Sequence, residues 1–400
     1  MANPILISIS PNITKDDVLL ALKTIFTPQS WQQGSASKLL SQNLKKILKQ
    51  DYCWLLNLGR TALQLGLEVL ELKSTDEVLC QAFPCVAVPN AIKAAGAKPV
   101  YIDTIKNGFN LSISDLTKKI TKNSKVLIIQ HTFGNPDDID KIKNICKKHN
   151  LTLIEDCAHS LGVNHKGKSV GSFGDLTMLS FGRDKVISSV FGGALLASNK
   201  DLAKKIDKRY NSLNYPSLSW IKKQLLHPII TGLIKPIYFT LGKYLMFIYQ
   251  KSSLLTWPVL AKEKQGQSGF KIKKMPNALS ILANHQLEKL EALNQRRQKI
   301  VKLYHQIFEV TNREYFPLLR YPILVNNPER VIKKAKQKKI LLGDWYRPVI
   351  APSGVDLKII GYKLNSCPNA ETVSKKIINL PTLITKSQAQ TLINLIYDHR

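Results

Sequence analysis

Three side chains with complementary chemistry follow two short apolar runs in the middle of the chain. The run Leu151–Asp156 ends in a carboxylate, and the run Leu176–Phe181 carries the Ser180 hydroxyl and leads into the Lys185 amine. Such runs are typical of parallel strands buried on both faces, and parallel sheets bind ligands beyond the carboxyl ends of their strands. We therefore expect Asp156, Ser180 and Lys185 to converge on one cleft.

An amine, a carboxylate and a hydroxyl are the groups that pyridoxal phosphate needs. A lysine amine forms a Schiff base with the cofactor aldehyde, and a buried carboxylate facing the pyridine nitrogen keeps that nitrogen protonated. We predict the first role for Lys185 and the second for Asp156. The alternative for an isolated Asp at a strand end is the cap of the next helix.

Several motifs follow one another in order around these residues: Ile154-Glu-Asp-Cys-Ala-His-Ser-Leu-Gly162, His165-Lys-Gly-Lys-Ser-Val-Gly-Ser-Phe-Gly-Asp175, Leu179-Ser-Phe-Gly-Arg-Asp-Lys185 and Gly192-Gly-Ala194. The series resembles the core of the DegT/StrS family of pyridoxal-phosphate-dependent sugar aminotransferases, which are fold type I enzymes. The resemblance implies that Lys185 is the Schiff-base lysine and Asp156 the pyridine partner. It also implies that His159 neighbours the phenolic oxygen of the cofactor and that Ser180 is a phosphate ligand.

A second phosphate-binding element is predicted at the segment Asn57–Leu67, which opens a helix directly after a glycine. Free amides and the helix dipole attract phosphate at such a position, although a lone Gly before a helix is usually only a turn. The family has its phosphate loop here, so the resemblance adds Gly59, Arg60 and Thr61 to the cofactor site. Arg60 stands where a small residue is more usual.

Two positions near the predicted site leave alternatives open. In the family an aromatic ring stacks on the cofactor where this chain has Cys85, so either the Cys85 thiol packs against the ring or Phe83 supplies that face. Cys85 is the preferred candidate. The segment His131–Pro136 resembles a loop beside the cofactor, and His131 is either a cofactor or substrate neighbour or a structural histidine at a strand end.

The resemblance also implies the substrates and the assembly. It predicts a nucleotide-linked keto-sugar acceptor, used in glycan or cell-surface polysaccharide biosynthesis, with glutamate as the amino donor and a homodimer as the active form. The family has an Asn-x-Arg that reaches the partner's cofactor site, and this chain has Ile272-Lys-Lys274. Lys274 supplies a positive charge there but lacks the bidentate grip of a guanidinium.

Composition narrows the remaining classes. The formal charge of +30 comes from lysines spread over most segments, so we do not expect a nucleic-acid partner. The charge reflects either solvated lysine-rich faces or attraction to anions. Six cysteines without a CxxC pair argue against disulfides and against a metal site. The first residues lack a basic region followed by an apolar run, so we expect a cytoplasmic protein.

Residues 220–251 depart from an ordinary enzyme of this kind because they are rich in Leu, Ile, Tyr and Phe and carry several lysines. A membrane span is not expected, since Lys235 and Lys243 interrupt the segment and Pro228 and Pro236 break a helix. One alternative is an interfacial helix that holds the protein at the inner face of the membrane. The other is an insertion packed over the active site or the dimer face.

The predicted architecture is α/β, with a mostly parallel sheet flanked by helices in a large domain and a smaller α+β C-terminal domain. A second hypothesis from another class is a non-catalytic pyridoxal-phosphate-binding protein with a regulatory or membrane-associated role. The predicted boundaries are an arm at 1–35, the large cofactor-binding domain at 36–209, the insertion at 210–272, and a domain-crossing helix with the small domain at 273–400.

Overall fold

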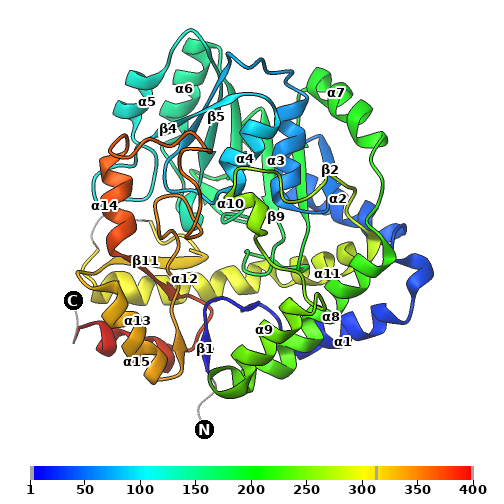
Figure 1. Cartoon of the computed structure of the whole chain (residues 1–400), viewed down its shortest axis with the longest axis vertical. Helices are drawn as coiled ribbons and strands as arrows, with labels where there is room; N and C mark the ends of the chain where they lie inside the picture. The colour runs from blue at the N-terminus through cyan, green and yellow to red at the C-terminus, as the bar shows by residue number, and fades with distance from the viewer. Residues whose placement is uncertain (1–3, 311–313, 398–400) are drawn as a thin grey trace.

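The computed structural model describes residues 4–310 and 314–397. Its centre is a seven-stranded sheet in the spatial order β2-β10-β9-β6-β5-β3-β4 (Figure 1). Every pairing is parallel except those of β10, which runs antiparallel to both neighbours, so the predicted mostly parallel sheet is confirmed. The strands are β2 (Tyr52–Leu56), β3 (Glu77–Gln81), β4 (Lys98–Ile102), β5 (Ser124–Gln130), β6 (Thr152–Asp156), β9 (Leu176–Ser180) and β10 (Gly193–Ala197).

Both faces of this sheet are covered by helices. Alternate residues of one strand enter different apolar layers: Val126 and Ile128 of β5 join the layer of α3 and α4, whereas Leu127 and Ile129 join that of α5 and α6. Burial on both faces explains why the strands are almost continuously apolar. The helices around the sheet are α2 (Ser35–Leu48), α3 (Gly59–Glu68), α4 (Ala87–Ala94), α5 (Ile113–Lys119), α6 (Ile139–His149) and α7 (Lys200–Asn211).

The smaller C-terminal part is built on an antiparallel pair of strands, β11 (Arg320–Leu324) and β13 (Ile377–Pro381). The N-terminal strand β1 (Ile5–Leu6) pairs in parallel with β12 (Ile340–Leu341), so the arm is attached to this part of the molecule. The accompanying helices are α13 (Pro328–Gln337), α14 (Pro368–Lys376) and α15 (Lys386–Tyr397). The predicted domain boundaries stay predictions.

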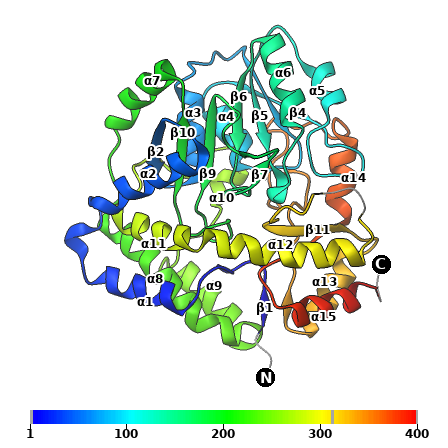
Figure 2. The ribbon, with the colours of Figure 1, turned by 180° about the vertical axis from the view of Figure 1, so that it is seen from behind.

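Two helices in succession connect the large part of the molecule to the small one, α11 (Asn277–Glu288) and α12 (Leu290–Ile307), as Figure 2 shows. The predicted domain-crossing helix is therefore interrupted at Lys289, whose ammonium forms ion pairs with Asp16 and Asp17. At the start of α2, Gly34 holds the N-cap position.

The insertion folds as α8 (Leu218–Ile234), two short irregular turns over Lys235–Gly242, α9 (Lys243–Lys251) and α10 (Ala261–Lys264). The expectation that Pro228 breaks the helix is wrong, since α8 runs through it, held between α1 (Lys15–Ile25) and α11. By length and composition alone, the stretch Leu218–Lys251 is a candidate membrane span, with 33% of its most apolar window buried in the protein.

Glu155 is a fully buried carboxylate that joins three segments beneath the strand ends. Its Oε1 accepts hydrogen bonds from the amides of Phe173 and Gly174, both at 2.7 Å, and its Oε2 from the Gly171 amide at 2.9 Å. His131 Nε2 lies 3.0 Å from the same Oε2. Burial alone raises the pKa of Glu155, but His131 and the backbone amides outweigh it and the pKa lies below its usual range.

Replacing Glu155 by Gln is expected to lower the free energy of unfolding by about 3 kcal/mol at neutral pH, because it removes a charge that buried donors surround. Because the pKa of Glu155 is depressed in the folded state, its charge stabilises that state above pH 4.5, the ordinary pKa of a glutamate. This contribution fades as the pH falls. Urea denaturation of both proteins should therefore give curves that converge in acid. Asp201→Asn, in an exposed pair with Lys204, is the control, and an equal loss there would contradict the role of Glu155.

Candidate active site

A cavity of about 180 Å³ opens at the carboxyl ends of the parallel strands. Five of the residues predicted for the site line it: Gly59, Arg60, Cys85, Ser180 and Lys185. The other walls come from distant parts of the chain: Leu58, Gly182, Arg183, Asp184, Phe191, Gly192, Pro258, Val259, Trp345, Tyr346, Ala351 and Pro352. A cleft therefore lies at the strand ends, with walls from the insertion and the small domain; Ser180 and Lys185 line it, and Asp156 lies outside its lining.

The N-terminus of α3 meets the end of β9 at very close range. A Cβ on Gly59 would lie 2.6 Å from the Cβ of Ser180, and a Cβ on Gly193 would lie 2.5 Å from the Gly59 nitrogen. Only glycine fits at either position. Backbone amides of the first turn of α3 and the Ser180 hydroxyl thus border one polar corner of the cavity, and a helix N-terminus of this kind attracts phosphate.

Thr61 shapes this corner through its hydroxyl group. Its Oγ1 donates to Asn57 Oδ1 at 2.9 Å and accepts from the Leu58 amide at 3.2 Å, and the side chain is buried. The hydroxyl is therefore engaged with the residues at the start of α3. The predicted contribution of Thr61 to cofactor binding stays a prediction.

The Lys185 amine is buried beside an imidazole. Its Nζ lies 3.0 Å from Nε2 of His159. Burial lowers the pKa of Lys185, and the charge of Arg320 acts in the same direction against the opposing effect of Asp156. A lowered pKa raises the fraction of free amine, which is the nucleophilic form.

His159 is held as a neutral imidazole with a defined tautomer. The Phe133 amide donates to its Nδ1 at 3.2 Å, so the ring proton is on Nε2, which faces Lys185 and, at 3.4 Å, the Tyr346 hydroxyl. Burial lowers its pKa well below the usual range, helped by Lys185 and Arg320. The ring is stacked between Phe133 and Trp345, each 5.9 Å away between centroids. His159 can therefore donate a proton in hydrogen bonding to an oxygen placed beside Lys185.

Asp156 ends β6 and is buried. Its Oδ1 accepts a hydrogen bond from the Ala158 amide at 3.0 Å. Burial raises its pKa, whereas that amide and the charge of Lys185 act to lower it. A buried carboxylate of this kind is stabilised in its charged form by a nearby cation, and a protonated ring nitrogen is such a cation.

The two alternatives for the cofactor-stacking position lie in different surroundings. Phe83 is fully buried and packs edge-on against Tyr346 with centroids 5.4 Å apart, so its ring belongs to the core. Cys85 lines the cavity, and its backbone bridges to Ala351. The geometry thus favours Cys85, the preferred candidate.

His131 and Lys274 lie outside the lining of this cavity. His131 is fully buried in the Glu155 network, and its Nδ1 accepts from the Asp137 amide at 3.3 Å. The ammonium of Lys274 lies 5.3 Å from the ring of Tyr210 and 5.9 Å from that of Tyr215. Their predicted roles toward a substrate or a partner's cofactor stay predictions.

Arg60 points toward the insertion. Its guanidinium pairs with the buried carboxylate of Glu263 and donates to the Pro258 carbonyl at 2.9 Å. On the other side of the cavity, Arg183 donates to the Thr256 carbonyl at 2.6 Å. Two arginines of the cofactor-binding part thus hold the loop that contributes Pro258 and Val259 to the cavity wall.

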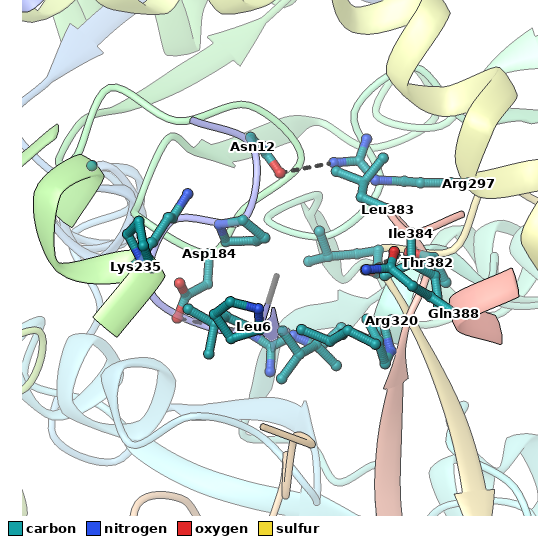
Figure 3. Close-up of a pocket in the computed structure, with 18 residues that line it drawn as sticks. Leu6, Asn12, Asp184, Lys235, Arg297, Arg320, Thr382, Leu383, Ile384 and Gln388 are labelled. Carbon is teal, nitrogen blue, oxygen red and sulfur yellow. Dashed lines mark hydrogen bonds and ion pairs between the residues drawn. The ribbon is translucent and has the colours of Figure 1, made fainter. Parts of the chain in front are cut away.

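A second cavity of about 330 Å³ adjoins the first, and Asp184 lines both. Figure 3 shows Arg297 and Arg320 on one side of it and Lys235 with Asp184 on the other. Arg320 is 1% exposed, and among the described residues its Nε and Nη2 have no hydrogen-bond partner. Its nearest carboxylate oxygen belongs to Asp184, 3.7 Å from Nη2. The second cavity is therefore lined by three cations and one carboxylate.

Arg320 and Lys185 are linked by one aromatic ring. The Arg320 guanidinium carbon lies 3.3 Å from the centroid of Trp345, and the Lys185 ammonium lies 5.2 Å from the same centroid. Trp345 also lines the first cavity. The Arg320 cation is thus placed next to the reactive amine, although it comes from the small domain.

The N-terminal arm reaches the backbone of the reactive lysine. Asn12 Nδ2 donates to the carbonyls of Lys185 and Val186 at 2.9 and 2.8 Å, and Arg297 Nη2 donates to the Val186 carbonyl at 3.0 Å. Asn12 and Arg297 are both buried and are hydrogen-bonded to each other at 3.3 Å (Figure 3). They are positioning residues for the Lys185 loop.

Comparison with known proteins agrees with this geometry. The model of the DegT/DnrJ/EryC1/StrS aminotransferase family matches residues 12–396. The chain belongs to this family. An uncharacterised protein of Methanocaldococcus jannaschii is a family relative, 30% identical over 342 residues, which cover 82% of this chain and 79% of the relative.

Relatives with a named activity match over a shorter stretch. GDP-perosamine synthase of Escherichia coli O157:H7 is 37% identical over 152 residues, 38% of this chain and 42% of the synthase. The chain thus spans less than half the length of that enzyme.

Solved structures match over nearly the whole chain. Helicobacter pylori PseC, described as an aminotransferase of pseudaminic acid biosynthesis, has a TM-score of 0.72 at 19% identity and covers 99% of this chain and 97% of its own. Bacillus subtilis NtdA, solved with bound pyridoxamine phosphate, has a TM-score of 0.74 at 19% identity and covers 100% and 85%. These matches establish the fold as fold type I.

The residues present fit pyridoxal phosphate. The glycine-lined corner at α3 and Ser180 suits a phosphate, Lys185 is a buried amine, and Asp156 is a buried carboxylate that a cation stabilises. His159 offers a proton to a phenolic oxygen between them. Each functional group of the cofactor thus has a protein group of matching chemistry.

Reduction with borohydride in the presence of pyridoxal phosphate is expected to attach the pyridoxyl group to Lys185, because its lowered pKa leaves the buried amine free to react. Peptide mapping by mass spectrometry locates the modification. Lys185→Ala should lose the covalent mass, and the control Lys274→Ala should retain it. A pyridoxyl mass on any other lysine would show that Lys185 is not the Schiff-base residue.

Proposed function

We propose that this protein is a pyridoxal-phosphate-dependent aminotransferase that transfers an amino group to the keto group of a nucleotide-linked sugar. The observation that carries the proposal is the buried Lys185 amine beside neutral His159, next to a corner suited to phosphate and with Asp156 behind it. Named relatives in the family support the substrate class, since they include GDP-perosamine synthases and transaminases of dTDP- and UDP-linked sugars. Such sugars are used in polysaccharide biosynthesis.

When bound, the cofactor supplies an electron sink for the substrate carbon that loses its proton. Asp156 would hold the proton on the pyridine nitrogen. Lys185 Nζ would act as the general base and then as the general acid toward the substrate carbon. The Nε2 proton of His159 would be donated to the phenolic oxygen, and the α3 amides with Ser180 would hold the phosphate.

Glutamate is the proposed amino donor. Arg320 is a buried guanidinium with unused donors beside the reactive amine, and a guanidinium binds a carboxylate through two parallel hydrogen bonds. Its cavity holds two further cations, Arg297 and Lys235, against the single carboxylate of Asp184. That excess of positive charge favours a donor with two carboxylates over a donor with one.

A homodimer is the proposed assembly. In fold type I enzymes each site is completed by the partner, and Lys274 lies outside the cavity of its own chain. The predicted contact of Lys274 with a cofactor site therefore requires the site of a second subunit. Light scattering tests this directly: we expect twice the chain mass of 45.0 kDa, and a fully active monomer at micromolar concentration would contradict it.

Asp156→Asn is expected to bind the cofactor but to lower turnover by at least about 100-fold, since a neutral amide does not hold the pyridine proton. Absorbance changes in the half-reaction with glutamate measure the effect. The matched control is Asp103→Asn, a buried carboxylate that follows β4 and accepts the amides of Asn369 and Ala370. It should lose stability and retain turnover; equal losses of turnover would make Asp156 a structural cap.

Arg320→Gln is expected to raise KM for glutamate at least tenfold and to leave KM for the sugar nucleotide unchanged. It should also raise the pKa of Lys185, because one of the charges that lowers that pKa is removed. Steady-state kinetics and the pH dependence of cofactor absorbance provide the two readouts. Arg347→Gln, which removes a half-buried arginine paired with the exposed Glu329, is the control. An unchanged glutamate KM in Arg320→Gln would separate Arg320 from donor binding while leaving the aminotransferase proposal intact.

A further inference from the structure

The face formed by α1, α8 and α9 carries most of the large apolar side chains that the described residues expose. Of 18 such side chains, 12 lie between Leu19 and Phe26 or between Leu218 and Trp257. These segments adjoin one another along the lower edge of Figure 1. Clustered exposure of this kind marks an interaction surface rather than scattered surface residues.

The helix α9 is the clearest part of this surface. None of its residues is buried. Tyr244, Phe247 and Ile248 are 59%, 54% and 55% exposed and lie at i, i+3 and i+4, so they share one face of the helix. Lys251 follows at i+7 on the same face, and Lys243 begins the helix. The result is an apolar stripe with a cation at each end.

The charge of the segment identifies the occupant. Between Leu218 and Lys251 there are five lysines and no acidic residue. Lysines beside an apolar helix face match an anionic lipid headgroup layer, where apolar side chains enter the acyl boundary and cations stay at the phosphates. A second protein that buried this stripe would need acidic groups at its rim, whereas a membrane supplies both properties at once.

We propose that the α8–α9 hairpin docks the protein on the surface of an anionic phospholipid membrane. The hairpin lies on that surface and does not cross it. Pro236 and the irregular turns over Lys235–Gly242 break the segment into two helices, and one face of α8 is packed against α1 and α11. The inserted part is therefore the outer face, chiefly α9.

The docking face is connected directly to the wall of the cavity. Trp257 is 39% exposed and lies edge-on to Phe247 with ring centroids 6.4 Å apart, and the next two residues, Pro258 and Val259, line the cavity. A membrane on this face therefore lies next to the loop that covers the reactive amine. The proposal concerns location and does not depend on the reaction that the site catalyses.

Vesicle flotation tests the proposal with the full-length holoenzyme. Vesicles of phosphatidylcholine and phosphatidylglycerol in equal parts should carry the protein to the top of the gradient, and vesicles of phosphatidylcholine alone should carry much less. Raising the salt from about 0.1 M to about 1 M shortens the screening length from about 10 Å to about 3 Å and should weaken flotation. Equal binding to both kinds of vesicle, unaffected by salt, would overturn the proposal. It would show that the lysines do not contribute to binding, and the choice of an anionic membrane rests on those lysines.

Two triple variants, each of which replaces three large exposed apolar side chains, give the decisive comparison. Tyr244→Ser, Phe247→Ser and Ile248→Ser together remove the stripe, and we expect flotation to fall at least 100-fold. Ile105→Ser, Ile359→Ser and Leu364→Ser together remove three exposed side chains elsewhere and should float like the wild type. Thermal unfolding and cofactor absorbance check that both variants fold.

Neutralising the two flanking cations by Lys243→Gln and Lys251→Gln is expected to weaken partitioning about 25-fold, at roughly fivefold for each lysine. Light scattering without vesicles gives the competing outcome. If the wild type does not float and the stripe variant changes the molecular mass, the face is a contact between subunits and the membrane proposal is wrong.

Discussion

The close approach between the N-terminus of α3 and the end of β9 is the constraint on which the site depends. There is no room for a Cβ on Gly59 beside Ser180, nor for one on Gly193 beside Gly59. The antiparallel strand β10 begins at Gly193 and pairs with β2 on one side and with β9 on the other. The close contact therefore lies where these three strands meet the start of α3. A larger side chain at either glycine would move the helix N-terminus away from Ser180 and separate the phosphate corner from the loop that holds Lys185.

Burial around this contact then sets the chemistry of the charged groups. Lys185 and His159 are both shifted toward their neutral forms, and Asp156 is shifted toward protonation, because each is removed from water. Burying these three groups costs free energy unless a ligand with complementary charges is bound. A cofactor with a protonated ring nitrogen, a phenolic oxygen and an aldehyde offers a group of matching chemistry to each of the three.

The sequence alone predicts the part of the site that follows from local pattern. Asp156, Ser180 and Lys185 stand at or beyond the ends of apolar runs, and parallel strands bring such ends to one edge. Arg320 and Trp345 could not be found in this way, because Trp345 reaches the first cavity and Arg320 the second only through packing of the small domain against the sheet. The sequence around Trp345 has no periodic pattern that would predict its contact with Lys185. Long-range packing, not propensity, decides those contacts.

The orientation of Arg60 shows the same limit and also links the insertion to the site. An arginine at the start of α3 suggests a phosphate ligand, yet its guanidinium pairs with Glu263, which is 203 positions away in the sequence and is fully buried. The phosphate corner is therefore left to backbone amides, the helix dipole and Ser180, and the cation is used to hold the cavity wall. That wall continues through Trp257, whose ring contacts that of Phe247 in the exposed stripe of α9. The insertion thus has two faces with different requirements. Its inner face needs polar groups that bind Arg60 and Arg183. Its outer face exposes apolar side chains, which is favourable only where something other than water covers them.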